Sequence, residues 1–448
     1  MAKAASAADR HAGKLERIAA EVRRLARAGA PVSFRKSAVS HQVPKANDPK
    51  RDDDKVDLTA LTEILELDPE RRLCVAEAGV TFEQLVDATL PHGLMPTVVP
   101  ELKTITVGGA VAGCSLESGS FVYGGFHDGC GRYEVITARG DVLQATPEAG
   151  NPDDRLLFEM LHGTFGTLGI LSAVSFRLVP AKPFVKVAYE RFATVAELQA
   201  AIRRHADRRD VDFLDGFAHG PSSYVLNAGK LVDEAPYAHR YDWTRVYCES
   251  TTRRREDYLR TKDYFFRYDH GVTNVHPRSA LGRLLSGGLF GSSQVLRLAA
   301  RFPWLLPSKP AVTVDLFLPF SSVDQFLCWF DDEFSFYPLW CVPYRRVRDY
   351  AWLDPRFYAG LADDLFLDVA VYGMKQRDGR NDYRTIDEKV LELGGVKTLI
   401  SHNYLTESEF WSVWNRASFD RVKARTDPDN LFRDLYEKTR APAEAAAR

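Results

Sequence analysis

The pattern of apolar and polar residues first indicates a helix at the start of the chain. Leu15, Ile18, Val22 and Leu25 recur at helical spacing within residues 1–30, and lysines and arginines occupy much of the remaining surface. This pattern predicts a basic amphipathic helix. Such a helix either rests on an anionic membrane or packs on its own domain, and we favour packing.

From residue 31 to residue 182 the pattern changes to short strands and turns. A strand is predicted over 73–79, a helix over 81–90 with Thr81 as its N-cap, and a hairpin around Arg139-Gly140. A further helix is predicted to begin near Phe158, and a long alternating strand ends at Pro180.

Two glycine-rich stretches interrupt these strands. Residues 104–125 hold six glycines and one charged residue, Glu117, and residues 163–169 hold three more glycines. Because each glycine costs a helix about 1 kcal/mol relative to alanine, the first stretch favours a bending loop over a packed helix. Such loops can bring bare backbone close to a phosphate or a flat ring, although they also serve as plain connections in β proteins. We interpret the two stretches as two walls of one ligand site.

From residue 183 onward, strands and helices have ordinary length. The last elements are predicted in the order strand, helix, strand, strand, helix, strand, which builds an antiparallel sheet with helices on one face. Their ranges are 312–318, 321–334, 339–345, 365–372, 386–393 and 396–404. They follow a helix over 194–209 and strands near 213–217, 224–230 and 241–248.

The segment Leu281–Leu306 combines large apolar residues with Arg283, Arg297 and Arg301. It is either a pair of core helices, which we favour, or a surface through which a lipid enters.

Composition narrows the class of protein. The 448 residues allow two or three domains, and the formal net charge of −2 does not suggest a nucleic-acid partner. Six scattered cysteines without C-x-x-C spacing indicate a reducing compartment and predict neither a metal site nor a disulfide framework. No signal peptide and no uncharged apolar run of about 20 residues is present, so we expect a cytoplasmic protein.

Several strings in the chain resemble flavoenzymes of the vanillyl-alcohol-oxidase type, and most closely the delta-24-sterol reductases of the Diminuto type. They are SHQVP (40–44), VPELKTITVGG, GCSLES, VYGG, GTLGIL, RLVPAK, PLWCVPY, NYLTESEFW and KARTDPDNLF. The resemblance covers nearly the whole chain after about residue 31. The family's membrane-spanning N-terminal segment is replaced here by the shorter basic helix.

The resemblance implies an α+β fold, with a two-lobed FAD-binding domain of the PCMH type and an antiparallel-sheet cap. The implied limits are 1–30 for the helix, 31–182 for the FAD domain, 183–400 for the cap, and 401–448 for a segment returning to the FAD domain. FAD is expected to bind non-covalently, although His41 matches the position where some members of the wider group attach it. The implied cofactor contacts are Ser40, His41, Thr104, Thr106, Val107, Gly108, Gly109, Gly113, Cys114, Glu117, Ser118, Tyr123, Gly163, Gly166, Thr167, Gly169 and Ile170.

The resemblance also implies a reaction in which NADPH reduces the flavin, and the flavin then passes hydride to one carbon of an alkene. An acid must protonate the other carbon. We nominate His402 and Tyr404, on the strand predicted to return to the flavin, and Glu117 in the glycine-rich loop. Structural roles for all three residues are the alternative.

The expected substrate is a lipid. The chain is rich in alanine and arginine, which is typical of a GC-rich bacterial source where sterol synthesis is uncommon. Bacterial relatives of this type act on methyl-branched fatty acyl chains, so we expect reduction of a methylene-branched acyl lipid first, and of a sterol or isoprenoid side chain next. A lipid methyltransferase would supply the branch, and the enzyme would contact the inner face of the membrane peripherally. The alternatives are a desaturase of methyl-branched acyl chains, a flavin alcohol or sugar oxidase, and a non-catalytic flavin-binding scaffold.

Overall fold

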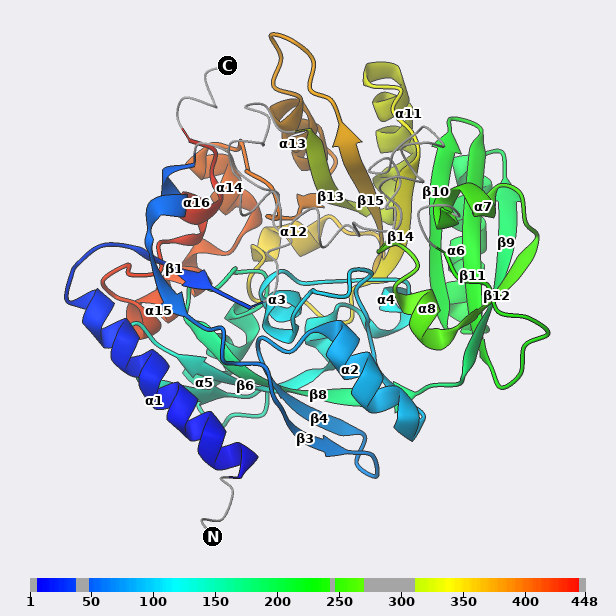
Figure 1. Ribbon diagram of the computed structural model, residues 1–448. Helices are drawn as coiled ribbons and strands as arrows, with labels where there is room; N and C mark the ends of the chain where they lie inside the picture. The colour runs from blue at the N-terminus through cyan, green and yellow to red at the C-terminus, as the bar shows by residue number, and fades with distance from the viewer. Residues whose placement is uncertain (1–5, 38–47, 242–245, 270–310, 443–448) are drawn as a thin grey trace.

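The computed structural model describes residues 6–37, 48–241, 246–269 and 311–442, and its elements form two lobes (Figure 1). In the first lobe, five antiparallel strands lie in the order β3 (Ile64–Asp68), β4 (Leu73–Glu77), β8 (Ile170–Pro180), β6 (Cys130–Ile136) and β7 (Val142–Ala145). The short strand β5 (Leu94–Pro96) also pairs with β8. A separate parallel pair joins β1 (Val32–Arg35) to β2 (Asp54–Asp57). The helices α2 (Phe82–Thr89), α3 (Val107–Ala112), α4 (Ser120–Tyr123) and α5 (Pro152–Met160) belong to the same part of the chain.

The second lobe is built on an eight-stranded antiparallel sheet, the cap sheet. Its order is β12 (Glu256–Arg260), β9 (Phe184–Phe192), β11 (Ser223–Val232), β10 (Phe213–Gly220), β14 (Leu339–Arg345), β15 (Leu365–Met374), β13 (Val312–Pro319) and β16 (Val396–Lys397). The helices α6 (Val195–Arg208), α11 (Val323–Glu333) and α13 (Asp382–Glu392) cover one face. The predicted order of strand, helix, strand, strand, helix, strand is confirmed, as is the α+β class. The short helix α12 (Pro355–Ala359) lies between β14 and β15 in the chain.

The other face of the cap sheet packs against the first lobe. Phe217, Trp340, Val342 and Ala370 from this face belong to one hydrophobic cluster with residues of the first lobe such as Val111. The interface between the two lobes is therefore a packed core.

The N-terminal helix α1 (Ala7–Ala26) packs on its own protein, which confirms the alternative that we favoured. Ser6 caps it, and its apolar stripe, including Ile18, Val22 and Leu25, is buried against the first lobe. The apolar stripe is thus covered by protein. Among the described residues, no helix is both long and apolar enough to span a bilayer.

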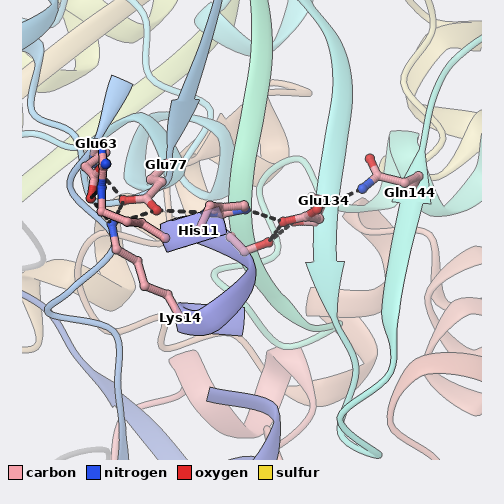
Figure 2. Close-up of polar contacts among 8 residues, drawn as sticks. His11, Lys14, Glu63, Glu77, Glu134 and Gln144 are labelled. Atoms are coloured by element: carbon pink, nitrogen blue, oxygen red, sulfur yellow. Dashed lines mark hydrogen bonds and ion pairs between the residues drawn. The ribbon is translucent and has the colours of Figure 1, made fainter. Parts of the chain in front are cut away.

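Polar contacts fix the first turns of α1 to the sheet (Figure 2). His11 contacts Glu77 through Nδ1 and Glu134 through Nε2, both at 2.8 Å, and Lys14 Nζ lies 2.7 Å from Glu63 and 2.9 Å from Glu77. We call these five residues the docking network. Its hydrogen bonds to Glu134 and Glu77 raise the pKa of His11 to about 9.

The C-terminal helices are α14 (Glu407–Val413), α15 (Arg416–Thr426) and α16 (Leu435–Thr439), and the last two contact the second glycine-rich stretch. Buried Lys423 donates to the carbonyl of Thr167 (2.8 Å) and pairs with Asp427 (2.6 Å). Lys438 donates to the carbonyl of Phe165 (2.7 Å). The string KARTDPDNLF therefore helps to hold one wall of the predicted site in place.

Three element predictions are wrong. The strand predicted near 241–248 does not include Tyr247 and Cys248, which belong to α7 (Tyr247–Thr251); residues 242–245 lie outside the described part. The strand predicted over 396–404 ends at Lys397, whose amine reaches Asp387 (2.7 Å) and the carbonyl of His402 (2.9 Å) across the turn that follows. The helix expected to begin near Phe158 begins earlier and ends close to that residue. Asn151 caps its N-terminus and Pro152 occupies its first turn, so the helix starts at Pro152.

Candidate flavin site

The two glycine-rich stretches lie side by side. Phe165 N donates to the carbonyl of Ala112 (3.1 Å), and Gly163 N donates to the carbonyl of Val111 (3.4 Å). A Cβ added at Gly163, whose φ is +66°, would lie 3.3 Å from Cys114 Sγ. The structure thus brings the two predicted walls together.

Part of the first stretch is a helix, which corrects the expectation of a plain loop. Thr106 caps α3 by accepting from Gly109 N (3.2 Å). A Cβ at Gly108 would lie 2.7 Å from the Cβ of Ala78, so this glycine lets α3 pack against the turn after β4. A Cβ at Gly166 would lie 2.6 Å from the ring of Phe34. The pattern did not distinguish glycines needed for packing from those that line a cavity.

A cavity of about 80 Å³ lies between the glycine-rich walls and the cap sheet. The walls contribute Gly113, Cys114, Leu116, Gly163 and Phe165. The rest of the lining is mostly aromatic or aliphatic and includes Phe317, Tyr344, Tyr350, Trp352, Leu353, Phe357, Phe366, Val396, Leu399 and Trp414, with His127, Arg346, Lys397 and Thr398 as polar exceptions.

One edge of the cavity is polar. The hydroxyls of Tyr344 and Tyr350 are hydrogen-bonded, and Tyr350 donates to Asp128 Oδ2 (2.9 Å). Arg348 Nη2 lies 3.3 Å from Asp128 Oδ1. His127, which also lines the cavity, is buried, and this burial lowers its pKa, so the ring is neutral at pH 7.

The chemistry of these residues suits a flat ring with polar atoms along its edge. Gly113 and Gly163 present no side chain on one side, and aromatic rings from the cap lobe lie on the other. The buried Trp352 Nε1 and both ring nitrogens of His127 have no hydrogen-bond partner among the residues that the structure describes. A buried donor or acceptor normally has a partner, so these atoms suit contacts to a ligand.

Comparison with known proteins decides the class of ligand. Residues 7–146, from α1 to the hairpin strand β7, match the family model described as FAD binding domain. The chain is an FAD-dependent oxidoreductase. The chain is 26% identical to the Delta(24)-sterol reductase homolog of Caenorhabditis elegans over 429 residues, which cover 86% of this chain and 78% of that protein. It is also 26% identical to Delta(24)-sterol reductase of Homo sapiens over 401 residues, covering 84% of this chain and 76% of the human protein.

A shorter part of the chain is similar to a relative with a different name. Over 128 residues, 28% of this chain and 27% of the other, the chain is 34% identical to decaprenylphosphoryl-beta-D-ribose oxidase of Mycolicibacterium smegmatis. A relative that is named an oxidase and relatives that are named sterol reductases thus resemble the same chain.

The predicted cofactor residues fall into three groups. Gly113, Cys114 and Gly163 line the cavity. Val107, Gly108, Thr167 and Ile170 are buried, and Tyr123 stacks with Arg177 at 5.7 Å. Ser40 and His41 lie outside the described residues. The cofactor contacts of all three groups stay predictions, as do those of the remaining residues Thr104, Thr106, Gly109, Ser118, Gly166 and Gly169.

His402 and Tyr404 do not line the cavity. Because β16 ends at Lys397, the chain leaves the cap sheet before it reaches them. His402 Nε2 lies 2.9 Å from Asp48 Oδ2, and Tyr404 stacks on Tyr383 of α13 at 5.5 Å. Their placement favours the structural alternative, and their catalytic role stays a prediction.

Glu117 follows Leu116 of the cavity wall and points into a buried polar cluster. Its Oε1 accepts from Ser118 N (3.0 Å) and lies 3.3 Å from Arg267 Nη2, which also lies 3.1 Å from Asp215. Burial raises the pKa of Glu117 to about 8; Arg267 opposes this shift, while Glu101 and Asp215 add to it. A carboxyl with this pKa is mostly protonated at pH 7 and can serve as an acid.

Sequence reasoning missed the cap residues of this cluster. Asp215, Asp315 and Asp368 each stand alone in an otherwise largely apolar strand, in the strings FLDGF, TVDLFL and LFLDVAV. A lone aspartate among buried strand residues is the signal that could have found them.

Proposed function

We propose that this enzyme reduces a carbon–carbon double bond in a lipid chain, with NADPH as the source of electrons. The observation that carries the proposal is the apolar, aromatic cavity between the glycine-rich walls and the cap sheet, with the buried acid Glu117 next to its wall. Similarity to Delta(24)-sterol reductases over most of the chain supports reduction of an alkene.

The protein's own residues have three tasks in such a reaction. FAD, when bound, supplies the hydride chemistry. Gly113 and Gly163 keep the cavity wall free of side chains at their positions, while Phe317, Trp352 and the neighbouring rings exclude water and hold an apolar chain. Glu117 holds a proton for the second carbon, which an isolated alkene needs because it accepts hydride poorly without protonation.

Among lipid alkenes, a methylene-branched fatty acyl chain is our first choice and a sterol or isoprenoid side chain the second. In both, protonation places positive charge on a branched carbon, which stabilises it. A methyltransferase that adds the one-carbon branch is the reaction that would supply the acyl substrate. Desaturation of a methyl-branched chain uses the same geometry in reverse.

The lipid must also reach the site. Exposing an acyl chain to water costs roughly 0.8 kcal/mol for each methylene, so a carrier or direct contact with the membrane is required. Leu281–Leu306, with Arg283, Arg297 and Arg301, lies outside the described residues, and its sequence alone supports the peripheral contact. Co-sedimentation with vesicles tests that contact. The wild type and a variant with all three arginines changed to glutamate are each mixed with anionic and with neutral vesicles.

Lipid analysis of a strain lacking the gene tests the reaction. Accumulation of methylene-branched or other unsaturated species is expected. Loss of an unsaturated species with build-up of its saturated precursor would instead indicate desaturation. Unchanged lipids with altered oxidation of a sugar or alcohol would overturn the proposal and favour an oxidase, the activity named for the M. smegmatis relative.

A further inference from the structure

The cap sheet presents a row of aspartates to the first lobe. Asp368 of β15 is paired in register with Phe317 of β13 and with Val342 of β14. Phe317 lines the cavity, and directly paired residues share a face of a sheet, so Asp368 lies on the cavity side. Asp315, two residues before Phe317, and Asp215, two residues before Phe217, share this face by the same alternation.

Two glutamates of the first lobe meet this row. Glu117 and Glu101 both lie near enough to Asp368 to raise its pKa, although burial and then Asp315 contribute more. We call the five carboxyls and Arg267 the acid cluster. Among the described residues, Arg267 is the cation that contacts it, through Glu117 and Asp215.

Asp215 has several partners at one oxygen, Oδ2, whereas its Oδ1 has no hydrogen-bond partner among the described residues. Asp215 pairs with Arg267, and its Oδ2 also accepts from the hydroxyl of Tyr268 and from Trp340 Nε1 (3.0 Å). Arg267 itself is fully buried and stacks on Tyr264, 4.0 Å from the ring centroid. This cation is therefore shared between Asp215 and Glu117.

Glu117 and Asp368 each keep one oxygen without such a partner. Among the described residues, Glu117 Oε2 and Asp368 Oδ1 are buried and have no hydrogen-bond partner, and the two residues are only 2% and 3% exposed. An ionised carboxylate with an unpartnered buried oxygen is costly, so the neutral, protonated form is favoured. No group of described side chains in this protein has the arrangement needed to hold a metal ion in place of the protons.

We propose that Asp368 is a second proton-holding residue of the active site, and that it and Glu117, one from each lobe, carry the proton that reduction adds to one carbon of the double bond. This inference rests on the proposed function. Reduction breaks the π bond and forms two C–H bonds, one with a hydride that the reduced cofactor provides and one with this proton. The carboxylate left behind regains a proton from solvent after turnover.

Infrared spectroscopy of the FAD-loaded protein tests the inference without any lipid. A protonated carboxyl has a C=O stretch that carboxylates lack and that shifts in D₂O. We expect this band at pH 7 in the wild type, with a component lost in Asp368→Asn and another lost or shifted in Glu117→Gln. Asp257→Asn is the matched control, because Asp257 is equally buried in the cap but is partnered by His239 (2.6 Å) and Tyr241.

Isotope labelling of the wild type covers the case in which a variant does not fold. Carbon-13 in the aspartate carboxyls should shift part of the band and carbon-13 in the glutamate carboxyls another part. A band that is absent at pH 7, or that ignores aspartate labelling and Asp368→Asn alike, would overturn the inference.

The two proposals fail separately. An enzyme that reduces no lipid alkene but shows the aspartate band would contradict the proposed function alone. An enzyme that reduces the alkene without that band, and with an unchanged pH dependence of turnover in Asp368→Asn, would contradict the role of Asp368 alone.

Discussion

The docking network and the acid cluster are both largely buried sets of charged residues, but they differ in the balance between acids and cations. In the docking network, His11 and Lys14 face Glu63, Glu77 and Glu134, and all of these side chains have partners (Figure 2). In the acid cluster, Arg267 contacts two of the five carboxyls, and oxygens of Glu117, Asp215 and Asp368 have no hydrogen-bond partner in the described part of the chain. A satisfied network holds a helix in place, whereas unsatisfied acids beside a cavity indicate chemistry.

The largest expected effect is a loss of activity from a change in the acid cluster. Glu117→Gln should slow reduction of the alkene by about 10²–10⁴-fold, the usual contribution of a general acid. Stability and FAD content should change little, because glutamine replaces a carboxyl that is already neutral. Stopped-flow absorbance of the flavin measures the rate of reduction, and thermal unfolding measures the stability. A large loss of stability with unchanged chemistry would assign Glu117 to structure instead.

The reverse result is expected for Glu77→Ala in the docking network. Glu77 is fully buried, and removing it leaves Lys14 and His11 without their shared anion. Losing one member of a buried ion pair costs about 3–5 kcal/mol, so the free energy of unfolding should fall by that order. Urea unfolding measures it, and the rate of the folded enzyme should not change. Wild-type stability in this variant would mean that α1 is held by its apolar stripe alone.

The pH dependence of stability gives a smaller effect. The pKa of His11 is about 9 in the folded protein and about 6.5 in the unfolded chain. A raised pKa means that the charged imidazole contributes stability fully below about pH 6.5 and loses that contribution as pH rises through about 9. Urea unfolding between pH 6 and 10 should therefore show a decline in the wild type that is reduced in His11→Gln. Parallel curves for the two proteins would contradict the raised pKa.

The smallest effect concerns the exposed edge of the docking network. Arg10 contacts Glu63 at 2.7 Å, with about half of the arginine side chain exposed (48%). Exposed ion pairs contribute little and are screened by salt. Arg10→Gln should therefore lower Tm far less than Glu77→Ala does, and added salt should reduce the difference from the wild type. A loss as large as that of Glu77→Ala would show that burial does not set the ranking.

Much of the fold was predictable because local patterns determine it. Thr81 and Thr194 cap their helices as the pattern of hydroxyl and following acidic or amide residue indicates, and strands such as Leu339–Arg345 are continuous apolar runs. The errors occur where distant partners decide. Lys397 ends its strand by reaching Asp387 and the His402 carbonyl, and neither contact is visible in local sequence.

The site was predictable in outline but not in detail. The two glycine-rich stretches do meet, yet Gly108 and Gly166 make room for Ala78 and Phe34, whereas Gly113 and Gly163 line the cavity. Asp215, Asp315 and Asp368 come from three strands, and only the register of the cap sheet aligns them. Composition and spacing contain no information about that register.

Anaerobic reoxidation of the reduced flavin by a lipid tests the central claim most directly. The FAD-loaded enzyme is reduced with NADPH, or with dithionite as the comparison, and mixed with vesicles of a phospholipid carrying a methylene-branched acyl chain. Vesicles of the saturated methyl-branched lipid are the control, and a sterol with a Δ24 double bond is the second substrate. We predict that an alkene lipid restores the absorbance of oxidised flavin, with one saturated product formed per flavin, and that the control does not. Reduced flavin that persists with every alkene lipid, in a protein shown to be folded and loaded with FAD, would contradict the account.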